Sequence, residues 1–185
     1  MRFFTPDLYV RFNSRNDEEA DEAYQEWEVA AARYTQYLDT FRGRLTTQVR
    51  KLTELALHDA QILARIEEIQ AVAQPFFQKE SLTILLPTWS AVGIVTVKDE
   101  GQIRSLIYCL CDRIRIQPPP ESWPFSAQGE HWLSDELELV TSQLGAALPG
   151  TFLHRILLSS GIVMEIPFTS VIVHEFSLVG IPQEV

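Results

Sequence analysis

The sequence is poor in cysteine, glycine and positive charge, and it has no apolar run long enough for a membrane-spanning helix. It holds 2 cysteines, 8 glycines and 15 Lys and Arg residues against 25 Asp and Glu residues, so the formal net charge is −10. Binding to a phosphate backbone requires clustered Lys and Arg. The longest apolar stretch, residues 82–97, contains Pro87 and Gly93 and falls short of the ~20 residues that a spanning helix needs. We therefore expect neither nucleic acid nor a membrane among the partners.

Sequence motifs for metal, nucleotide and nucleophile chemistry are also missing. The chain has no HExxH, no pair of CxxC motifs, no glycine-rich phosphate loop and no G-x-S-x-G. These absences predict no cofactor and no metal. The same absences argue against nucleotide-dependent chemistry by a familiar route.

The two cysteines predict a reducing location. Cys109 and Cys111 are one residue apart on an expected strand, where a disulfide would need strained geometry. We expect free thiols that pack in the core. The first twelve residues also lack an apolar segment of signal-peptide length. Together these features predict a soluble, cytoplasmic protein.

A chain of 185 residues suits one domain, here residues 1–185, and its first half reads as helical. Asn16 followed by Glu19 indicates a capping box at the start of a helix. Apolar and aromatic residues then recur with a 4-3 spacing that gives one stripe. The residues of this stripe are Ala20, Tyr24, Trp27, Ala31, Tyr34, Leu38 and Phe41.

A second helical pattern begins near Thr46 or Thr47 and runs towards Ala73, where Pro75 would end it. At 100° per residue one face collects Leu45, Leu52, Leu55, Ala56, Ile62, Leu63 and Ile66. The two helices would form an antiparallel hairpin over about residues 14–74.

The second half of the chain, about residues 80–180, reads as strands. Short β-rich runs alternate with loop signals, and residues 98–102 and 159–161 suit hairpin turns. Residues 117–130 are rich in proline and read as a loop. The fold class predicted is α+β, an N-terminal antiparallel helical hairpin packed on a largely antiparallel β-sheet. The expected strands are 82–86, 91–97, 103–116, 132–140, 152–158, 162–168 and 171–178.

Three residues are candidates for catalysis. Asp59 falls on the apolar face of the second expected helix, where a carboxylate must be paired, hydrogen-bonded or protonated. With the adjacent His58 and with His154 from a strand it could form an acid–base or metal-binding group. The alternative is structural, since Asp59 could fasten the helix to the sheet, and His154 on an apolar strand face could be a satisfied core histidine.

Other residues suggest a surface for a partner. Acidic residues Glu18, Glu22 and Glu26 lie on the first helix and could face a basic protein, whose association negative potential would steer. Trp89 and Trp123 lie in or beside loops and could anchor such an interface. The alternative is a solvated acidic face without a partner.

Several segments resemble those of a family of uncharacterised bacterial proteins. They are Phe3-Phe4-Thr5, Leu57-His58-Asp59-Ala60, Trp132-Leu133-x-Asp135-Glu136 and His154 to Gly161. The resemblance spreads over most of the chain, but none of its motifs is specific for an activity. It implies a bacterial source and transfers no catalytic residue.

The leading hypothesis is therefore a non-enzymatic bacterial interaction protein, of the immunity or antitoxin type, that binds another protein. Small size, acidic charge and the absence of catalytic motifs motivate it. The alternative is a small hydrolase or metal-dependent enzyme using His58, Asp59 and His154, which predicts that these side chains converge in one open cleft. A third option is a subunit of a larger assembly, marked by an exposed apolar patch near Leu57 or Trp89.

Overall fold

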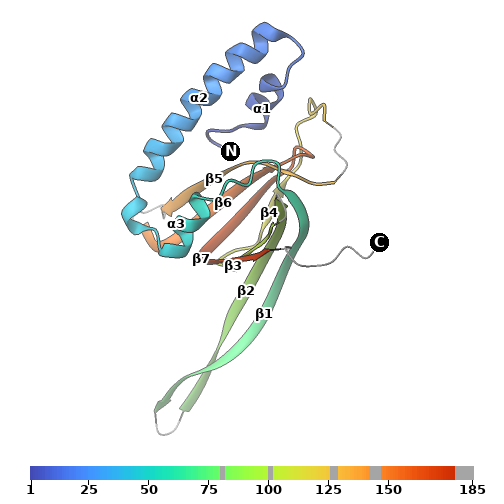
Figure 1. Cartoon of the computed structure of the whole chain (residues 1–185). Coiled ribbons are helices and arrows are strands. Elements are labelled where there is room, and N and C mark those ends of the chain that lie inside the picture. Colours follow the sequence, from blue (N-terminus) through green and yellow to red (C-terminus); the bar gives the residue numbers. More distant parts are fainter. Residues whose placement is uncertain (80–81, 100–101, 126–128, 142–146, 178–185) are drawn as a thin grey trace.

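The computed structural model shows an α+β fold in which N-terminal helices pack on one antiparallel sheet, as predicted (Figure 1). It describes residues 1–79, 82–99, 102–125, 129–141 and 147–177, with the backbone alone for 68–79, 82–90, 141, 147–149 and 177. The helices are α1 (Pro6–Phe12), α2 (Asp17–Asp39), the short 3-10 helix η1 (Arg42–Arg44) and α3 (Thr47–Thr53).

Within the described residues seven strands form the sheet, and all of their pairings are antiparallel. Their order is β1-β2-β3-β7-β6-β5, and β4 pairs with β7 beside this path. The strands are β1 (Gln61–Lys79), β2 (Leu82–Asp99), β3 (Gln102–Leu110), β4 (Arg115–Gln117), β5 (Trp132–Thr141), β6 (Ala147–Leu158) and β7 (Val163–Ser177).

Helix α2 confirms the first predicted helix. The Asn16 side chain caps it by accepting a hydrogen bond from the Glu18 amide, and acidic residues fill its first turn, where the helix dipole favours them. The aromatic stripe packs against the N-terminal segment, because the ring of Phe4 contacts those of Trp27 and Tyr34. Local signals were therefore sufficient to place this helix.

The second predicted helix is wrong beyond Thr53. Helix α3 covers Thr47–Thr53 only, and the residues expected to continue it form the strand β1. The chain leaves the helix at a turn where Asp59 has a left-handed φ of 64°. Leu63 and Ile66, assigned to the buried helix face, are 46% and 51% exposed. Pairing with β2 overrode the helical spacing.

Most of the predicted strands are confirmed, but the structure merges some of the predicted runs into one strand and divides another. The runs at 82–86 and 91–97 belong to one strand, β2. Those at 162–168 and 171–178 belong to β7, which starts at Val163, and residue 178 lies outside the described residues. The run at 103–116 is divided between β3 and β4. The connection expected at 143–150 is strand from Ala147 on, and residues 142–146 lie outside the described residues.

The sheet curls until its two ends meet. The first residues of β1 contact the start of β5, where Ile62 N–H donates to the Glu130 carbonyl over 2.7 Å and Gln61 bridges to His131. Helix α3 supplies Val49 and Leu52 to the enclosed core, and each such side chain contributes about 1.5–3 kcal/mol when fully buried. The largest fully buried side chains include Trp132, Tyr108, Phe152 and Phe168.

Strands β1 and β2 project well beyond the other strands (Figure 1). Strand β3 pairs with β2 only over Ala91–Asp99, so the distal part of the projecting ribbon has two strands. Pro75, expected to end a helix, lies inside β1 opposite Leu85. The ribbon is the most extended feature of the described backbone.

The two cysteines agree with the sequence prediction in their redox state and differ from it in their burial. Cys109 and Cys111 are free, as predicted, but both are exposed, so their predicted core role is wrong. The cause for Cys109 is that its face of β3 is the outer face of the sheet, which it shares with the half-buried Ile107.

Among the described residues, no helix combines the length and the apolar character needed to cross a membrane.

Candidate interaction site

A groove of about 650 Å³ lies between the N-terminal segment, α1 and α2. Its walls carry charges of both signs, from Arg2, Arg11 and Arg33 and from Glu22 and Glu26. Apolar side chains such as Leu8 and Val29 complete the lining. The groove combines polar and apolar surface and is open to solvent.

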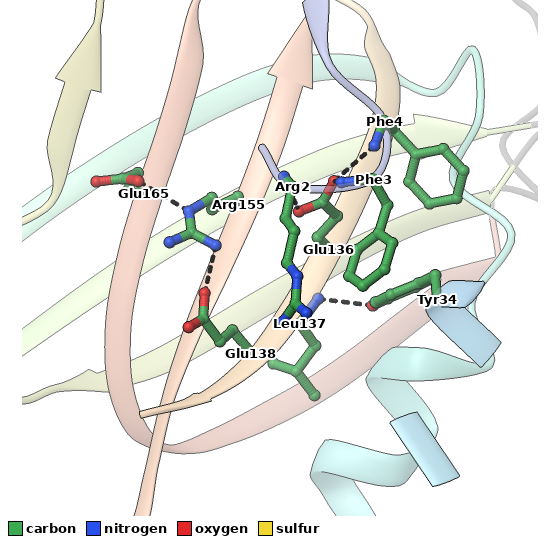
Figure 2. A network of polar contacts seen from close by, with 9 residues as sticks. All are labelled: Arg2, Phe3, Phe4, Tyr34, Glu136, Leu137, Glu138, Arg155 and Glu165. Atoms are coloured by element: carbon green, nitrogen blue, oxygen red, sulfur yellow. Dashed lines mark hydrogen bonds and ion pairs between the residues drawn. The ribbon is translucent and has the colours of Figure 1, made fainter. Parts of the chain in front are cut away.

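A buried carboxylate positions the N-terminal wall of this groove. Glu136 on β5 is only 2% exposed, and its carboxylate accepts hydrogen bonds from the backbone amides of Arg2, Phe3 and Phe4 at 2.7, 2.6 and 2.7 Å (Figure 2). Such bonds are required because an unpaired buried carboxylate is costly. The side chain of Glu136 thereby fixes the chain that leads into α1.

Helix α2 is attached to the same strand. The Tyr34 hydroxyl accepts a hydrogen bond from the Leu137 amide over 2.6 Å (Figure 2). Burial raises the pKa of Tyr34, and the nearby Asp135 carboxylate raises it further. Arg2 lies over the rings of Phe3 and Tyr37, with its guanidinium carbon about 5 Å from each ring centre. These contacts hold α2 against the edge of the sheet.

An ionic link closes the far side of the groove. Arg11 on α1 forms two hydrogen bonds to the Glu26 carboxylate on α2 and a longer contact of 3.4 Å to Asp7. The hydrogen bond from Arg11 holds the pKa of Glu26 below its usual range. The link is exposed, so it orients the two helices more than it stabilises them.

Two of the three predicted acidic residues line this groove. Glu18, Glu22 and Glu26 are all exposed on α2, and Glu22 and Glu26 line the groove. None of the ion pairs between described residues involves Glu18 or Glu22. Both carboxylates are therefore available to a partner.

The structure describes the side chain of one of the two predicted tryptophan anchors, Trp123, and this residue does not line the groove. The Trp123 ring stacks on Tyr9 with 5.9 Å between ring centres, and its Nε1–H donates to the Ser159 carbonyl. It also covers Gly161, where an added Cβ would lie 2.5 Å from the indole. Trp123 thus packs within the molecule. Trp89 is in β2, and its side chain lies outside the described residues.

His154 does not lie in an open cleft. Its ring is fully buried between the Tyr108 hydroxyl, 2.9 Å from Nδ1, and the Asp135 carboxylate, 2.9 Å from Nε2. The Trp132 indole donates to the other Asp135 oxygen over 3.1 Å. A neutral ring that donates from Nε2 and accepts at Nδ1 satisfies every group. This arrangement supports the core-histidine interpretation.

His58 and Asp59 lie at the turn between α3 and β1. His58 Nδ1–H donates to the Leu133 carbonyl over 2.6 Å, and its Nε2 is 3.5 Å from the Asp59 carboxylate. Both side chains are exposed, at 62% and 74%. The predicted burial of Asp59 on a helix face is wrong, because no helix continues to this residue. The predicted convergence with His154 is also wrong, since that ring is enclosed.

No sequence signal marks Glu136, the residue that positions the N-terminal wall of the groove. Alternation along β5 places Glu136 and Glu138 on a polar face, which predicts solvent exposure. In the structure the N-terminal segment covers Glu136, while Glu138 pairs with Arg155, which also pairs with Glu165 (Figure 2). Burial lowers the pKa of Arg155, but the bonds to Glu165 and Glu138 outweigh it and raise the pKa.

Comparison with known proteins adds no assignment. The chain matches no protein-family model, and no curated protein is significantly similar to it. Within the described residues, no group of three or more His, Cys, Asp or Glu side chains could hold a metal ion. The geometry of the groove is therefore the basis for a functional hypothesis.

Proposed function

We propose that this chain is an interaction protein that binds a basic partner protein through α2 and the groove beside it. One observation carries the proposal: Glu18 and Glu22 are exposed on α2 and form no ion pair within the described residues, and Glu22 lines the groove. Negative potential on such a surface accelerates encounter with a basic partner and selects against acidic ones.

The groove adds apolar binding surface next to the acidic surface of α2. Lys or Arg side chains of the partner would contact Glu18 and Glu22, while apolar side chains of the partner would enter beside Leu8 and Val29. Val29 is 50% exposed, so it offers apolar surface without rearrangement. A charged rim around apolar surface is the usual composition of a protein interface.

Finer parts of the proposal rest on the sequence. We propose the immunity or antitoxin type, in which a small acidic chain masks a basic protein, and a bacterial source, which the resemblance implies. We also propose the cytoplasm as its location, with support from the two exposed free thiols. No cofactor enters this proposal.

The experiment is capture of the partner from the native host by the wild-type chain and by charge-reversed variants. The variant E18K/E22K should lose the partner, because it replaces two attractive contacts with repulsive ones. The control E54K/E121K changes the net charge equally at exposed residues on other parts of the molecule and should retain the partner. The captured protein should be basic, and its retention should fall as salt is added.

Two results would refute the proposal. One is the absence of any stable partner. The other is equal loss of the partner from E18K/E22K and E54K/E121K, which would show that overall charge, and not the surface of α2, determines binding. Circular dichroism of each variant confirms that α2 is intact before capture is compared.

A further inference from the structure

Strand β1 is an edge of the sheet, and most of its outer side has no partner among the described strands, although Arg65, Glu67 and a register shift between Ile62 and Ala64 partly protect it. Its inner side pairs with β2, and its outer side bonds to the segment before β5 only at Gln61 and Ile62. From Leu63 on, no described strand pairs with that outer side. Leu63 and Ile66 are nevertheless 46% and 51% exposed. Folded proteins usually shorten, bend or charge such an edge, because it is a template for another strand.

An apolar row on the outer face of the sheet ends at this edge. The strand register places Ile66 beside Ile94, Ile94 beside Ile107, and Ile107 beside Ile172. Ile172, at the other end of the row, is 48% exposed. The row therefore spans four strands and stops at Ile66, where a further strand would continue it.

The charges beside Ile66 fit a second copy of the same strand. Arg65 and Glu67 flank Ile66, and both are exposed in a shallow cleft of about 230 Å³. In a symmetric antiparallel pair of identical strands, the residue before the centre lies opposite the residue after the centre in the second copy. With Ile66 at the centre, Arg65 of each copy lies opposite Glu67 of the other.

Neighbouring registers lack this complementarity. A centre at Arg65 places two arginines opposite each other, and a centre at Glu67 places two glutamates together, which destabilises a strand pair. A centre at Ala64 sets Leu63 opposite Arg65. Of these registers, only the one centred on Ile66 joins two opposite-charge pairs with one isoleucine pair, so the sequence of this edge specifies both the partner and the register.

We propose that two copies of this chain pair antiparallel through the outer edges of β1, centred on Ile66, and form one sheet across the dimer. The paired segment starts at Leu63, where the contact with Glu130 ends. The net charge of −10 on each copy opposes association at low salt, whereas at physiological salt the Debye length of about 8 Å confines this repulsion to short range. The dimer does not depend on the proposed partner of α2, because it uses another surface.

Sedimentation velocity of the full chain over a concentration series tests this dimer. The wild-type chain should sediment as a monomer–dimer equilibrium. R65E places two glutamates opposite each other at both symmetric positions, so its dimer dissociation constant should rise on the order of tenfold or more. The control R15E makes the same change of net charge at an exposed residue before α2 and should match the wild type.

Mixing two single variants gives a sharper result. R65E carries two acidic residues at the edge and E67R carries two basic ones, so each should dimerise poorly alone and the two should form a heterodimer when mixed. Because the Glu67 carboxylate also accepts a hydrogen bond from the Ile114 amide, E67R is first checked for a native unfolding temperature. The double variant R65E/E67R restores both charge pairs and should recover the wild-type dimer.

The proposal is overturned if the wild-type chain stays monomeric at every concentration. It is equally overturned if the chain dimerises and R65E dimerises as tightly, because that would place the contact elsewhere. A heterodimer of R65E with E67R that is no tighter than either homodimer would exclude the register centred on Ile66.

Discussion

Glu136 shows how one residue organises the site. Its carboxylate is buried under the N-terminal segment and accepts three backbone hydrogen bonds, so the start of the chain, α1 and the wall of the groove all depend on it. Nothing in the alternation of β5 distinguishes Glu136 from the more exposed Glu138. Its role arises from contacts more than a hundred residues apart in sequence, which no local pattern encodes.

Replacing Glu136 by Gln should lower the free energy of unfolding by about 1–3 kcal/mol. Glutamine keeps one oxygen for the amides of Phe3 and Phe4 but turns an NH₂ group towards the Arg2 amide, so one donor loses its acceptor. Urea unfolding measures the change, and E121Q at an exposed position is the matched control. If E136Q is as stable as the control, the N-terminal segment does not depend on this carboxylate.

The buried tyrosines predict how the protein behaves in alkali. Burial raises the pKa of both Tyr34 and Tyr108, and the Asp135 carboxylate adds to each effect. In the unfolded chain both hydroxyls ionise near pH ~10. Above that pH the unfolded state binds fewer protons than the folded state, so stability should fall as the pH rises, whereas well below it these two groups contribute no pH dependence.

Absorbance at about 295 nm, which reports tyrosinate, should therefore rise in two stages above pH ~10. The second stage should coincide with loss of the circular dichroism signal, because Tyr34 and Tyr108 ionise only when the chain unfolds. The variant Y108F should reduce that second stage. Complete ionisation of every tyrosine in a chain that is still folded would contradict the burial of these residues.

At the scale of elements, α2 could be predicted from the sequence and β1 could not. Helix α2 has a cap, an acidic first turn and an aromatic stripe, all of which are local. The residues of β1 also show a helical spacing, but their pairing with β2 determines their structure, and Ile62 bonds to Glu130 far along the chain. Strand β5 could be predicted from its alternation, and most of β6 and β7 from the turn signal at residues 159–161, because these local signals agree with the strand pairing.

Asp59 marks the point where the helix prediction failed, and its backbone gives a test. A left-handed φ of 64° is unfavourable for residues with a Cβ, although Asp tolerates it better than most. D59A should destabilise the protein by about 1 kcal/mol, whereas D59G should be nearly neutral because glycine adopts this φ freely. Thermal unfolding of the two variants compares them directly.

If D59A and D59G lose equal stability, the side chain of Asp59 and not its backbone is what matters. The exposed contact with His58, at 3.5 Å, would then contribute more than a surface pair usually does. We expect the backbone to dominate, because the Asp59 amide also donates to the Trp132 carbonyl over 2.8 Å and so holds the turn in place.

At the scale of the whole molecule, the two proposed binding surfaces, α2 with its groove and the outer edge of β1, differ in charge and in shape. The outer side of α2 is acidic and borders a groove, and the opposite charges of the β1 edge complement a second copy of the same strand. The curled sheet holds these surfaces on different elements, so we expect a partner on α2 and a second copy on β1 to bind independently. The positions of Glu18, Glu22 and Glu26 on the first expected helix predicted the acidic surface, while the edge required the strand order to be known.

The central claim is that α2 and its groove bind a partner protein, and hydrogen–deuterium exchange tests it most directly. Exchange is measured by mass spectrometry on the wild-type chain alone and in complex with its captured partner. We predict slower exchange in the complex at residues 18–33 of α2, which include the groove lining from Glu22 to Arg33, and around Arg2 and Leu8, which also line the groove. Unchanged exchange at these residues, with protection confined to other elements, would contradict the claim.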